Sequence, residues 1–242
     1  MKIEEMLGMV DHTALKAVTT WKDIQKLCEE AIKYKTASVC IPASYIKRVS
    51  DKYGEKLVIC TVIGFPLGYS TTATKVFEAE DAVKNGAREV DMVVNLGDVK
   101  NGDFQKVTDE IHKIKEAIGD ITLKVIVETC YLTEEEKVEL CKCVTEGGAD
   151  YIKTSTGFGT AGAKVEDIEL FRKHIGKNVK IKAAGGIRTK EDLEKFYQAG
   201  VDRIGASAAV KWRQMSEIVS ASIHDRHRFL GNWSNERCKR IW

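Results

Sequence analysis

Two lysines occur in segments that otherwise have the composition of buried β-strands. Lys153 lies in ADYIKTST, and Lys182 lies 29 residues later in VKIKAAGG. Neighbouring strands are about 4.8 Å apart, so inward side chains at similar heights would bring the two ammonium groups together. Burial and a second positive charge both oppose protonation, and the pKa of at least one lysine should therefore fall. Since a neutral amine attacks carbonyls, we predict that Lys153 is a Schiff-base nucleophile and Lys182 its perturbing partner.

Asp91, in EVDMVVN, could supply the acid or base that such a reaction needs. A Schiff-base reaction moves protons at the carbinolamine and at the α-carbon, and a carboxylate can move them directly or through water. The structural alternative is that the lysines point outward or pair with a carboxylate such as Asp91 or Glu128. Two lysines in mid-strand beside an aspartate favour a catalytic role, and Asp91 could also keep Lys182 charged.

Glycine-rich segments end three strand-like runs in the second half of the chain: STGFGTAG (155–162), AAGGIRT (183–189) and GASAA (205–209). Glycine lets backbone amides approach an anion, and α/β barrels often hold phosphate with their last loops. Glycine also simply makes turns. Three such loops after consecutive strands nevertheless predict a phosphorylated substrate, with Arg188 as a candidate partner.

The segments that must position these residues recur along the chain. A glycine turn followed by a β-branched apolar run is found at 85–95, 147–156 and 199–207. Further strand candidates lie at 8–15, 37–42, 57–66, 121–129 and 179–186. The helical patterns between them start at three candidate capping boxes, which are Thr20 with Asp23, Thr133 with Glu136, and Thr189 with Asp192.

Eight alternating strand and helix units favour a closed (β/α)8 barrel over an open sheet. The dinucleotide-binding glycine fingerprint follows none of the strands, which also disfavours the open alternative. We therefore predict an α/β fold with a single TIM barrel and a short N-terminal helix. The expected division is a barrel domain at 1–211 and an atypical C-terminal tail at 212–242, which could complete the last helix.

Composition restricts the kind of protein further. The chain has 242 residues, of which 43% are hydrophobic and 31% charged, and its formal net charge is +2. No apolar run approaches the roughly 20 residues of a membrane span, and the N-terminus does not have the pattern of a secretion signal. The seven cysteines lack metal-ligand spacing. We expect a soluble, cytoplasmic protein with reduced thiols, no metal, no membrane contact, and a basic tail that is solvated rather than bound to nucleic acid.

Several long motifs together resemble the deoxyribose-phosphate aldolase family. DHTALK, SVCIP, VIGFPLG, EVDMVVN, LKVIVET, YIKTSTGFGTAGA and IKAAGGIRT occur in this order over residues 7–211. The resemblance implies a class I aldolase, a lyase without metal or other cofactor, that acts in deoxyribonucleoside catabolism. Its reaction would be the reversible cleavage of 2-deoxy-D-ribose 5-phosphate to acetaldehyde and D-glyceraldehyde 3-phosphate. It also implies a homo-oligomer, either a dimer or a tetramer.

The resemblance also implies roles for individual residues. Lys153 matches the Schiff-base lysine, Lys182 the second lysine and Asp91 the proton-relay aspartate. Asp11, Thr13 and Cys40 match positions that line the substrate pocket. The positions that match the phosphate site are Gly157, Gly185, Gly186, Arg188, Gly205, Ser207 and Ala208.

The chain departs from the family pattern at two places. Phe158 stands where some members have a phosphate-binding lysine, so the charge at that end would depend on Arg188 and backbone amides. Some members have a C-terminal tyrosine that assists proton transfer, whereas the last tyrosine here is Tyr197. The tail could be an extension or the product of a shifted reading frame, and we expect slower proton transfer with carbonyl capture retained.

Two other functions remain open at this level. One is a different Schiff-base aldolase, such as a transaldolase or a deoxyketose-phosphate aldolase, which a ketone donor would distinguish from an aldehyde donor. The other is a phosphosugar-binding protein without turnover, for which binding would occur without release of acetaldehyde. Fold alone does not separate these functions, because barrels support many reactions.

Overall fold

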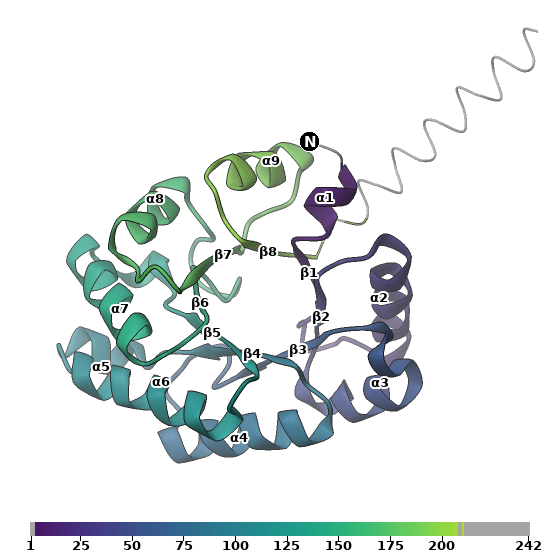
Figure 1. Cartoon of the computed structure of the whole chain (residues 1–242), viewed down its shortest axis with the longest axis horizontal. Helices are drawn as coiled ribbons and strands as arrows, with labels where there is room; N and C mark the ends of the chain where they lie inside the picture. Colours follow the sequence, from purple (N-terminus) through teal and green to yellow (C-terminus); the bar gives the residue numbers. More distant parts are fainter. Residues whose placement is uncertain (1–2, 208–209, 211–242) are drawn as a thin grey trace, which may run out of the picture.

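The computed structural model describes residues 3–207 and 210, in which eight parallel strands close into a barrel (Figure 1). The strands are β1 (Val10–Thr13), β2 (Ser38–Cys40), β3 (Ile59–Ile63), β4 (Glu89–Val93), β5 (Thr122–Ile126), β6 (Tyr151–Lys153), β7 (Lys180–Ala184) and β8 (Arg203–Ala206). Each strand pairs with the next along the chain, and β8 pairs with β1. The predicted barrel is therefore confirmed, and every strand lies within its predicted segment.

Helices surround the ring of strands on the outside (Figure 1). They are α1 (Ile3–Leu7), α2 (Trp21–Tyr34), α3 (Ile46–Tyr53), α4 (Thr72–Asn85), α5 (Leu96–Lys100), α6 (Phe104–Ile118), α7 (Glu134–Glu146), α8 (Val165–His174) and α9 (Lys190–Gln198). Short 3-10 turns lie at Ala43–Tyr45, Gly54–Lys56 and Thr129–Tyr131. The short N-terminal helix expected from the sequence is α1.

The starts of three helices are set by the predicted capping boxes. Thr20, Thr133 and Thr189 each accept the amide N–H of the residue three positions on, and the carboxylate of that residue accepts the threonine N–H. Each pair satisfies two of the amides that a helix N-terminus leaves without an intrahelical acceptor. These three helices therefore begin where the local sequence requires.

The apolar core lies between the strands and the helices. On β4, Val90 and Met92 are fully buried in this layer. Glu89 and Asp91, which alternate with them, form ion pairs inside the barrel. The general expectation that branched apolar residues fill a barrel interior is therefore wrong for much of this one, where charged side chains from several strands meet.

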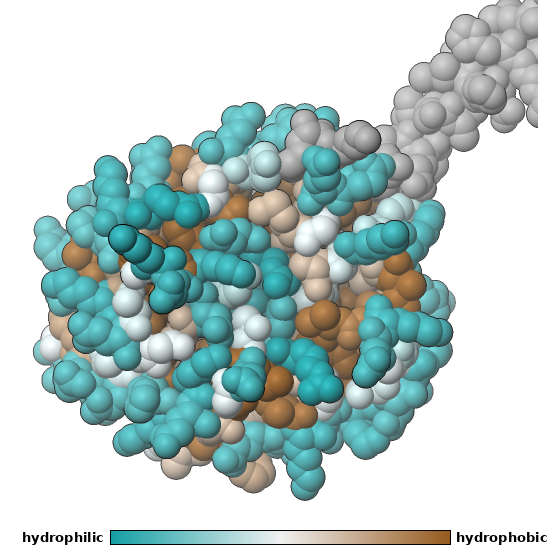
Figure 2. Space-filling view, in the orientation of Figure 1, coloured by the Kyte–Doolittle hydropathy of each residue, from teal (hydrophilic) through white to brown (hydrophobic). Residues whose placement is uncertain are grey.

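The outer surface is mixed in character. Figure 2 shows that hydrophilic residues cover most of one face and that hydrophobic residues form separate patches between them. Among the described residues, none of the helices combines the length and the apolar character needed to cross a membrane. The predicted tail, 212–242, lies outside the described residues, so the boundary at 211 stays a prediction.

Candidate active site

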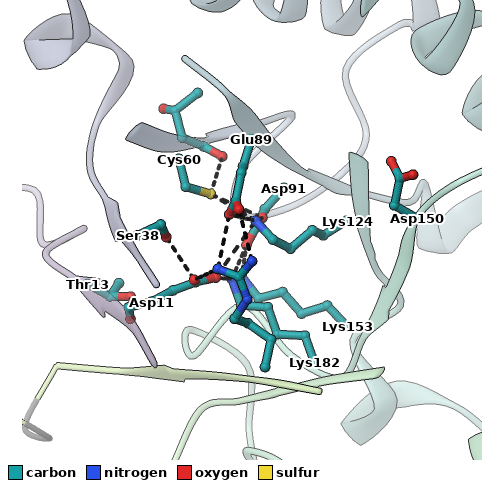
Figure 3. Close-up of polar contacts among 12 residues, drawn as sticks. Asp11, Thr13, Ser38, Cys60, Glu89, Asp91, Lys124, Asp150, Lys153 and Lys182 are labelled. Atoms are coloured by element: carbon teal, nitrogen blue, oxygen red, sulfur yellow. Dashed lines mark hydrogen bonds and ion pairs between the residues drawn. The ribbon is translucent and has the colours of Figure 1, made fainter. Parts of the chain in front are cut away.

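Asp91 is the centre of the charged interior (Figure 3). Its Oδ2 lies 2.7 Å from the Nζ of Lys153 and 2.7 Å from the Nζ of Lys182. Its Oδ1 lies 2.8 Å from the Nζ of Lys124. Strand register explains why these side chains lie close together, because Lys153 pairs with Lys182 on the neighbouring strand and Asp91 pairs with Lys124. The structure therefore brings together the three residues predicted to be catalytic.

A second carboxylate, that of Asp11 on β1, binds the other side of Lys182. Its Oδ2 lies 2.5 Å from the Lys182 Nζ, and its Oδ1 accepts hydrogen bonds from Ser38 at 2.7 Å and from Arg203 at 2.6 Å. Asp11 is fully buried. It holds Lys182 in place, and its predicted contact with substrate stays a prediction.

Glu89 completes the cluster toward the N-terminal ends of the strands. Its carboxylate lies 2.6 Å from the Nζ of Lys124 and 3.0 Å from a guanidinium nitrogen of Arg203. Three carboxylates and four basic groups are therefore in contact. When all of them are ionised, the cluster has one excess positive charge.

The charges shift the titration of their neighbours strongly. Burial alone would raise the pKa of Asp91, but Lys124, Lys153 and Lys182 outweigh burial and hold that pKa well below its ordinary value. Burial would likewise lower the pKa of Lys182, but Asp11 and Asp91 outweigh burial and raise it. The sequence predicted a lowered pKa for at least one of the two lysines and allowed that Asp91 keeps Lys182 charged; Lys182 is the lysine that two carboxylates keep charged.

Four members of this network were missed from the sequence. Lys124 is fully buried in mid-strand, which is the signal that identified Lys153. Glu89 and Arg203 begin β4 and β8, and a charged residue at the start of a strand is also typical of the turn that precedes it, so the sequence gives no signal for them. Cys60 shows no comparable signal, since cysteine is common in buried strands.

Cys40 on β2 and Cys60 on β3 are pairing partners, and both are buried. The Cys60 thiol donates to Asp91 Oδ1 at 3.2 Å, and its sulfur lies 3.3 Å from the Nζ of Lys124. Cys40, predicted to line the pocket, has a sulfur within 4.8 Å of Cys60 and Asp91 ligand atoms. The six cysteines in the described part of the chain are free thiols.

Two groups of potential metal ligands occur among the described residues, and both belong to the cluster. They are Cys40, Cys60 and Asp91, and Asp11, Cys60 and Glu89. The Lys124 ammonium group lies within 3.8 Å of a carboxylate oxygen of Asp11, Glu89 and Asp91, at 3.7, 2.6 and 2.8 Å. An ammonium group thus already neutralises the carboxylates of both sets. The expectation of a metal-free site stays a prediction.

The glycine-rich loops that follow β6 and β7 contact each other at the end of the barrel where these strands end, which is its mouth. A Cβ added to Gly162 would lie 2.2 Å from the carbonyl oxygen of Gly185, so only glycine permits this approach. Gly157, Gly185 and Gly186 have φ values of 86°, 82° and 77°. Within the described residues, the amide N–H groups of these three glycines have no protein acceptor. Such a group of amides is suited to an anion.

The other predicted positions differ in their surroundings. The Thr13 hydroxyl donates to the backbone oxygen of Asp11 at 2.8 Å. Arg188 and Ser207 are exposed. Gly205 lies beside the stem of Lys182, because an added Cβ would be 3.4 Å from its Cε. Ala208 lies outside the described residues.

Phe158, which replaces a lysine found in some relatives, is half-exposed at 54%. Its ring packs edge-to-face on Phe65, with centroids 5.3 Å apart. The loop after β6 therefore contacts the loop after β3 through aromatic rings. No cation stands at this position.

Comparison with known proteins identifies the family. Residues 6–215 match the family model described as DeoC/LacD family aldolase. Deoxyribose-phosphate aldolase of Clostridium botulinum strain Alaska E43 is 62% identical over 210 residues, which cover 87% of this chain and 95% of that protein. The Clostridioides difficile strain 630 protein of the same name is 60% identical over 209 residues, covering 86% and 95%.

A solved structure is also similar. Deoxyribose phosphate aldolase from Aeropyrum pernix, described as having a unique tetrameric structure, is 30% identical with a TM-score of 0.81, and the match covers 87% of this chain and 90% of that one. The matched residues include the whole charged cluster and both glycine-rich loops. The chain therefore belongs to the DeoC/LacD family of aldolases.

Proposed function

We propose that this protein is a deoxyribose-phosphate aldolase that cleaves 2-deoxy-D-ribose 5-phosphate reversibly to acetaldehyde and D-glyceraldehyde 3-phosphate. The observation that carries the proposal is that Lys153 and Lys182 both contact the same carboxylate oxygen of Asp91 in a buried site. The names of its relatives at about 60% identity support the same substrate. Lys153 is the proposed Schiff-base lysine.

Charge balance supports the choice of Lys153 over the other two lysines. Lys153 has an ion pair with Asp91 alone, whereas Lys182 pairs with two carboxylates and Lys124 with three. The cluster is electrically balanced when one lysine is a neutral amine, which is the form that attacks a carbonyl. Giving up one ion pair costs less than giving up two or three. Lys153 is therefore the lysine that can be neutral at the least cost.

The proposed reaction follows from this arrangement. The Lys153 Nζ adds to the C1 aldehyde, and loss of water gives an iminium ion. Removal of the C3 hydroxyl proton then breaks the C2–C3 bond, whose electrons pass to the iminium and form an enamine, while C3 becomes the aldehyde carbon of D-glyceraldehyde 3-phosphate, which leaves. Protonation at C2 and hydrolysis release acetaldehyde and restore the amine. Asp91 moves these protons directly or through water, while charged Lys182 orients it.

The phosphate group would be held at the mouth of the barrel. The free amides of Gly157, Gly185 and Gly186 are suited to its oxygens, and the exposed Arg188 could supply a positive charge. We also propose that the protein forms a homo-oligomer, as described for the Aeropyrum protein. Light scattering on the full chain would measure its mass directly.

The proposal requires no metal. The carboxylates that could bind one are already paired with Lys124 and Lys182. Prolonged dialysis against a chelator should therefore leave aldol cleavage unchanged. Loss of activity that added Zn²⁺ or Mn²⁺ restores would contradict this part of the proposal.

The decisive experiment is borohydride trapping. The protein is incubated with 2-deoxyribose 5-phosphate, reduced with borohydride and mapped by peptide mass spectrometry. We expect one reduced acetaldehyde or sugar unit on the peptide that contains Lys153, and none in Lys153→Ala. The control variant, Lys106→Ala at an exposed lysine, should be trapped like wild type. No adduct in the folded protein would exclude Schiff-base chemistry and leave a phosphosugar-binding protein.

A further inference from the structure

Glu128 follows β5 in a backbone conformation that is unusual for its type. Its φ and ψ are 55° and 63°, in the left-handed region. The other non-glycine residue with positive φ in the described part of the chain is Lys35, which caps the C-terminus of α2. For a residue other than glycine this conformation is unfavourable and persists only where surrounding contacts enforce it. The contacts of Glu128 therefore indicate what the conformation is for.

The Glu128 carboxylate holds the loop that follows Lys153. It accepts the Thr156 amide N–H at 3.1 and 3.3 Å through its two oxygens, and it accepts the Thr156 hydroxyl as well. The Thr156 Oγ1 in turn accepts the Phe158 amide N–H at 3.0 Å. A continuous chain of hydrogen bonds thus runs from Phe158 through Thr156 to Glu128. It fixes the backbone on both sides of Gly157.

The loop also lies in direct contact with this carboxylate. A Cβ added to Gly159 would lie 3.2 Å from Oε1 and 3.2 Å from the carboxyl carbon of Glu128, and 2.8 Å from the Cys130 sulfur. Glu128 is 2% exposed, so the loop excludes water from it. Burial raises the pKa of Glu128, while the bonds from Thr156 and the charge of Lys153 oppose that rise. The carboxylate is thus a buried support under the residues from Thr156 to Gly159.

We propose that Glu128 is a positioning residue that, through Thr156, shapes the loop after β6 for binding the substrate phosphate. With the Thr156 and Phe158 amides satisfied internally, the Gly157 amide stays available, and a Cβ added to Gly157 would lie 3.9 Å from the Cα of Gly185 in the next loop. This inference rests on the proposed function, because it assigns the phosphate end of that site. Replacing Glu128 should therefore reduce activity more with a substrate that carries a phosphate than with one that does not.

The test compares 2-deoxyribose 5-phosphate with 2-deoxyribose. Glu128→Gln keeps the size of the side chain but replaces one acceptor oxygen with a donor, which opposes a donor of Thr156. We expect kcat/KM for the phosphorylated sugar to fall about tenfold more than kcat/KM for the unphosphorylated sugar, mainly through KM. Glu135→Gln, at an exposed glutamate on α7, serves as the matched control and should change neither value.

Variants of Thr156 provide an independent measurement. Thr156→Ser keeps the hydroxyl and should retain most of the preference for the phosphorylated sugar, whereas Thr156→Val should lose it as Glu128→Gln does. The double variant should be no worse than the poorer single variant, because both changes break the same chain of hydrogen bonds. Inorganic phosphate should raise the thermal midpoint of wild type and Glu135→Gln more than that of Glu128→Gln.

The outcomes separate this inference from the proposed function. Equal loss with both sugars, or additive effects in the double variant, would overturn the inference and assign Glu128 a purely structural role. Failure of both Glu128→Gln and Thr156→Val to fold would have the same meaning. Absence of borohydride trapping in wild type would instead overturn the proposed function itself. Trapping in wild type with an unchanged phosphate preference in the variants would overturn the inference alone.

Discussion

A lysine in a protein core is costly unless carboxylates neutralise it, and this barrel contains three lysines with different numbers of carboxylate partners. Lys124 has three, Lys182 has two and Lys153 has one. The same residue type can therefore serve different purposes within a few ångströms. The lysines with more partners hold the carboxylates, and the lysine with one partner is the proposed Schiff-base lysine.

Lys124 should be the most important of the three for stability. In Lys124→Met, Glu89 and Asp91 each lose their ion pair with Lys124 in a buried site, and removing one partner of a buried ion pair costs about 3–5 kcal/mol. We expect the free energy of unfolding in urea to fall by that amount. The control is Lys106→Met, whose exposed ion pair with Asp98 should leave the value almost unchanged. Equal effects in the two variants would contradict this assignment.

The cysteines should differ in reactivity for a related reason. Burial raises the pKa of Cys28 and of Cys141 to about 12, so neither forms appreciable thiolate at neutral pH. Cys130 is partly exposed. Brief treatment of the native protein with iodoacetamide at pH 8 should therefore label Cys130 ahead of the other two. Peptide mass mapping measures this order, and labelling in urea should abolish it. Early labelling of Cys28 would show that α2 opens readily.

At the scale of elements, local signals predicted most of the fold. The capping residues Thr20, Thr133 and Thr189 begin helices as expected, since a capping box acts within four residues. The strands were recognisable because each is a short apolar run after a turn. Lys124 lies in mid-strand like Lys153, but its contact with Asp91 depends on strand register between residues 33 apart. The left-handed Glu128 has no sequence signal, because its cause is a contact with a later loop.

The contact between the loops after β6 and β7 can be tested at one glycine. In Gly162→Ala the new methyl group would lie 2.2 Å from the Gly185 oxygen and 2.8 Å from the Gly186 nitrogen, so the loops must separate. We expect a loss of about 1–3 kcal/mol in unfolding free energy and a higher KM for the phosphorylated sugar. Gly8→Ala, whose nearest neighbour would be an ordinary 3.4 Å away, is the control. An unchanged KM for the phosphorylated sugar would show that this contact between the loops does not contribute to phosphate binding.

For the whole molecule, the cluster should contribute stability over a wide pH range. The pKa values of Asp11 and Asp91 are held below the ordinary 3.8, because the cations outweigh the effect of burial. Their contribution is therefore complete above that value and is lost as pH falls through the lowered pKa. The pKa values of Lys124 and Lys182 are raised above 10.5, so their contribution is complete below 10.5 and is lost as pH rises further.

This sign argument leads to a measurable plateau. The difference in unfolding free energy between wild type and Lys124→Met should stay constant from about pH 5 to 9 and shrink as pH falls below about 4. Urea titrations of both proteins at a series of pH values would measure it. If this free-energy difference changed steadily across neutral pH, one of the buried groups would titrate there. That result would contradict the lowered carboxylate pKa values and raised lysine pKa values of the cluster.

The ion pair of Arg203 with Asp11 has a consequence for how the protein is made. It joins residues 192 apart in sequence and links the last strand to the first. On the ribosome, Asp11 is synthesised long before its guanidinium partner exists, and contacts this distant form slowly. While β8 is still inside the ribosome, the sheet of the nascent chain is therefore open and its carboxylates are incompletely neutralised. Binding of the sugar should accordingly begin only after synthesis has passed the eighth strand.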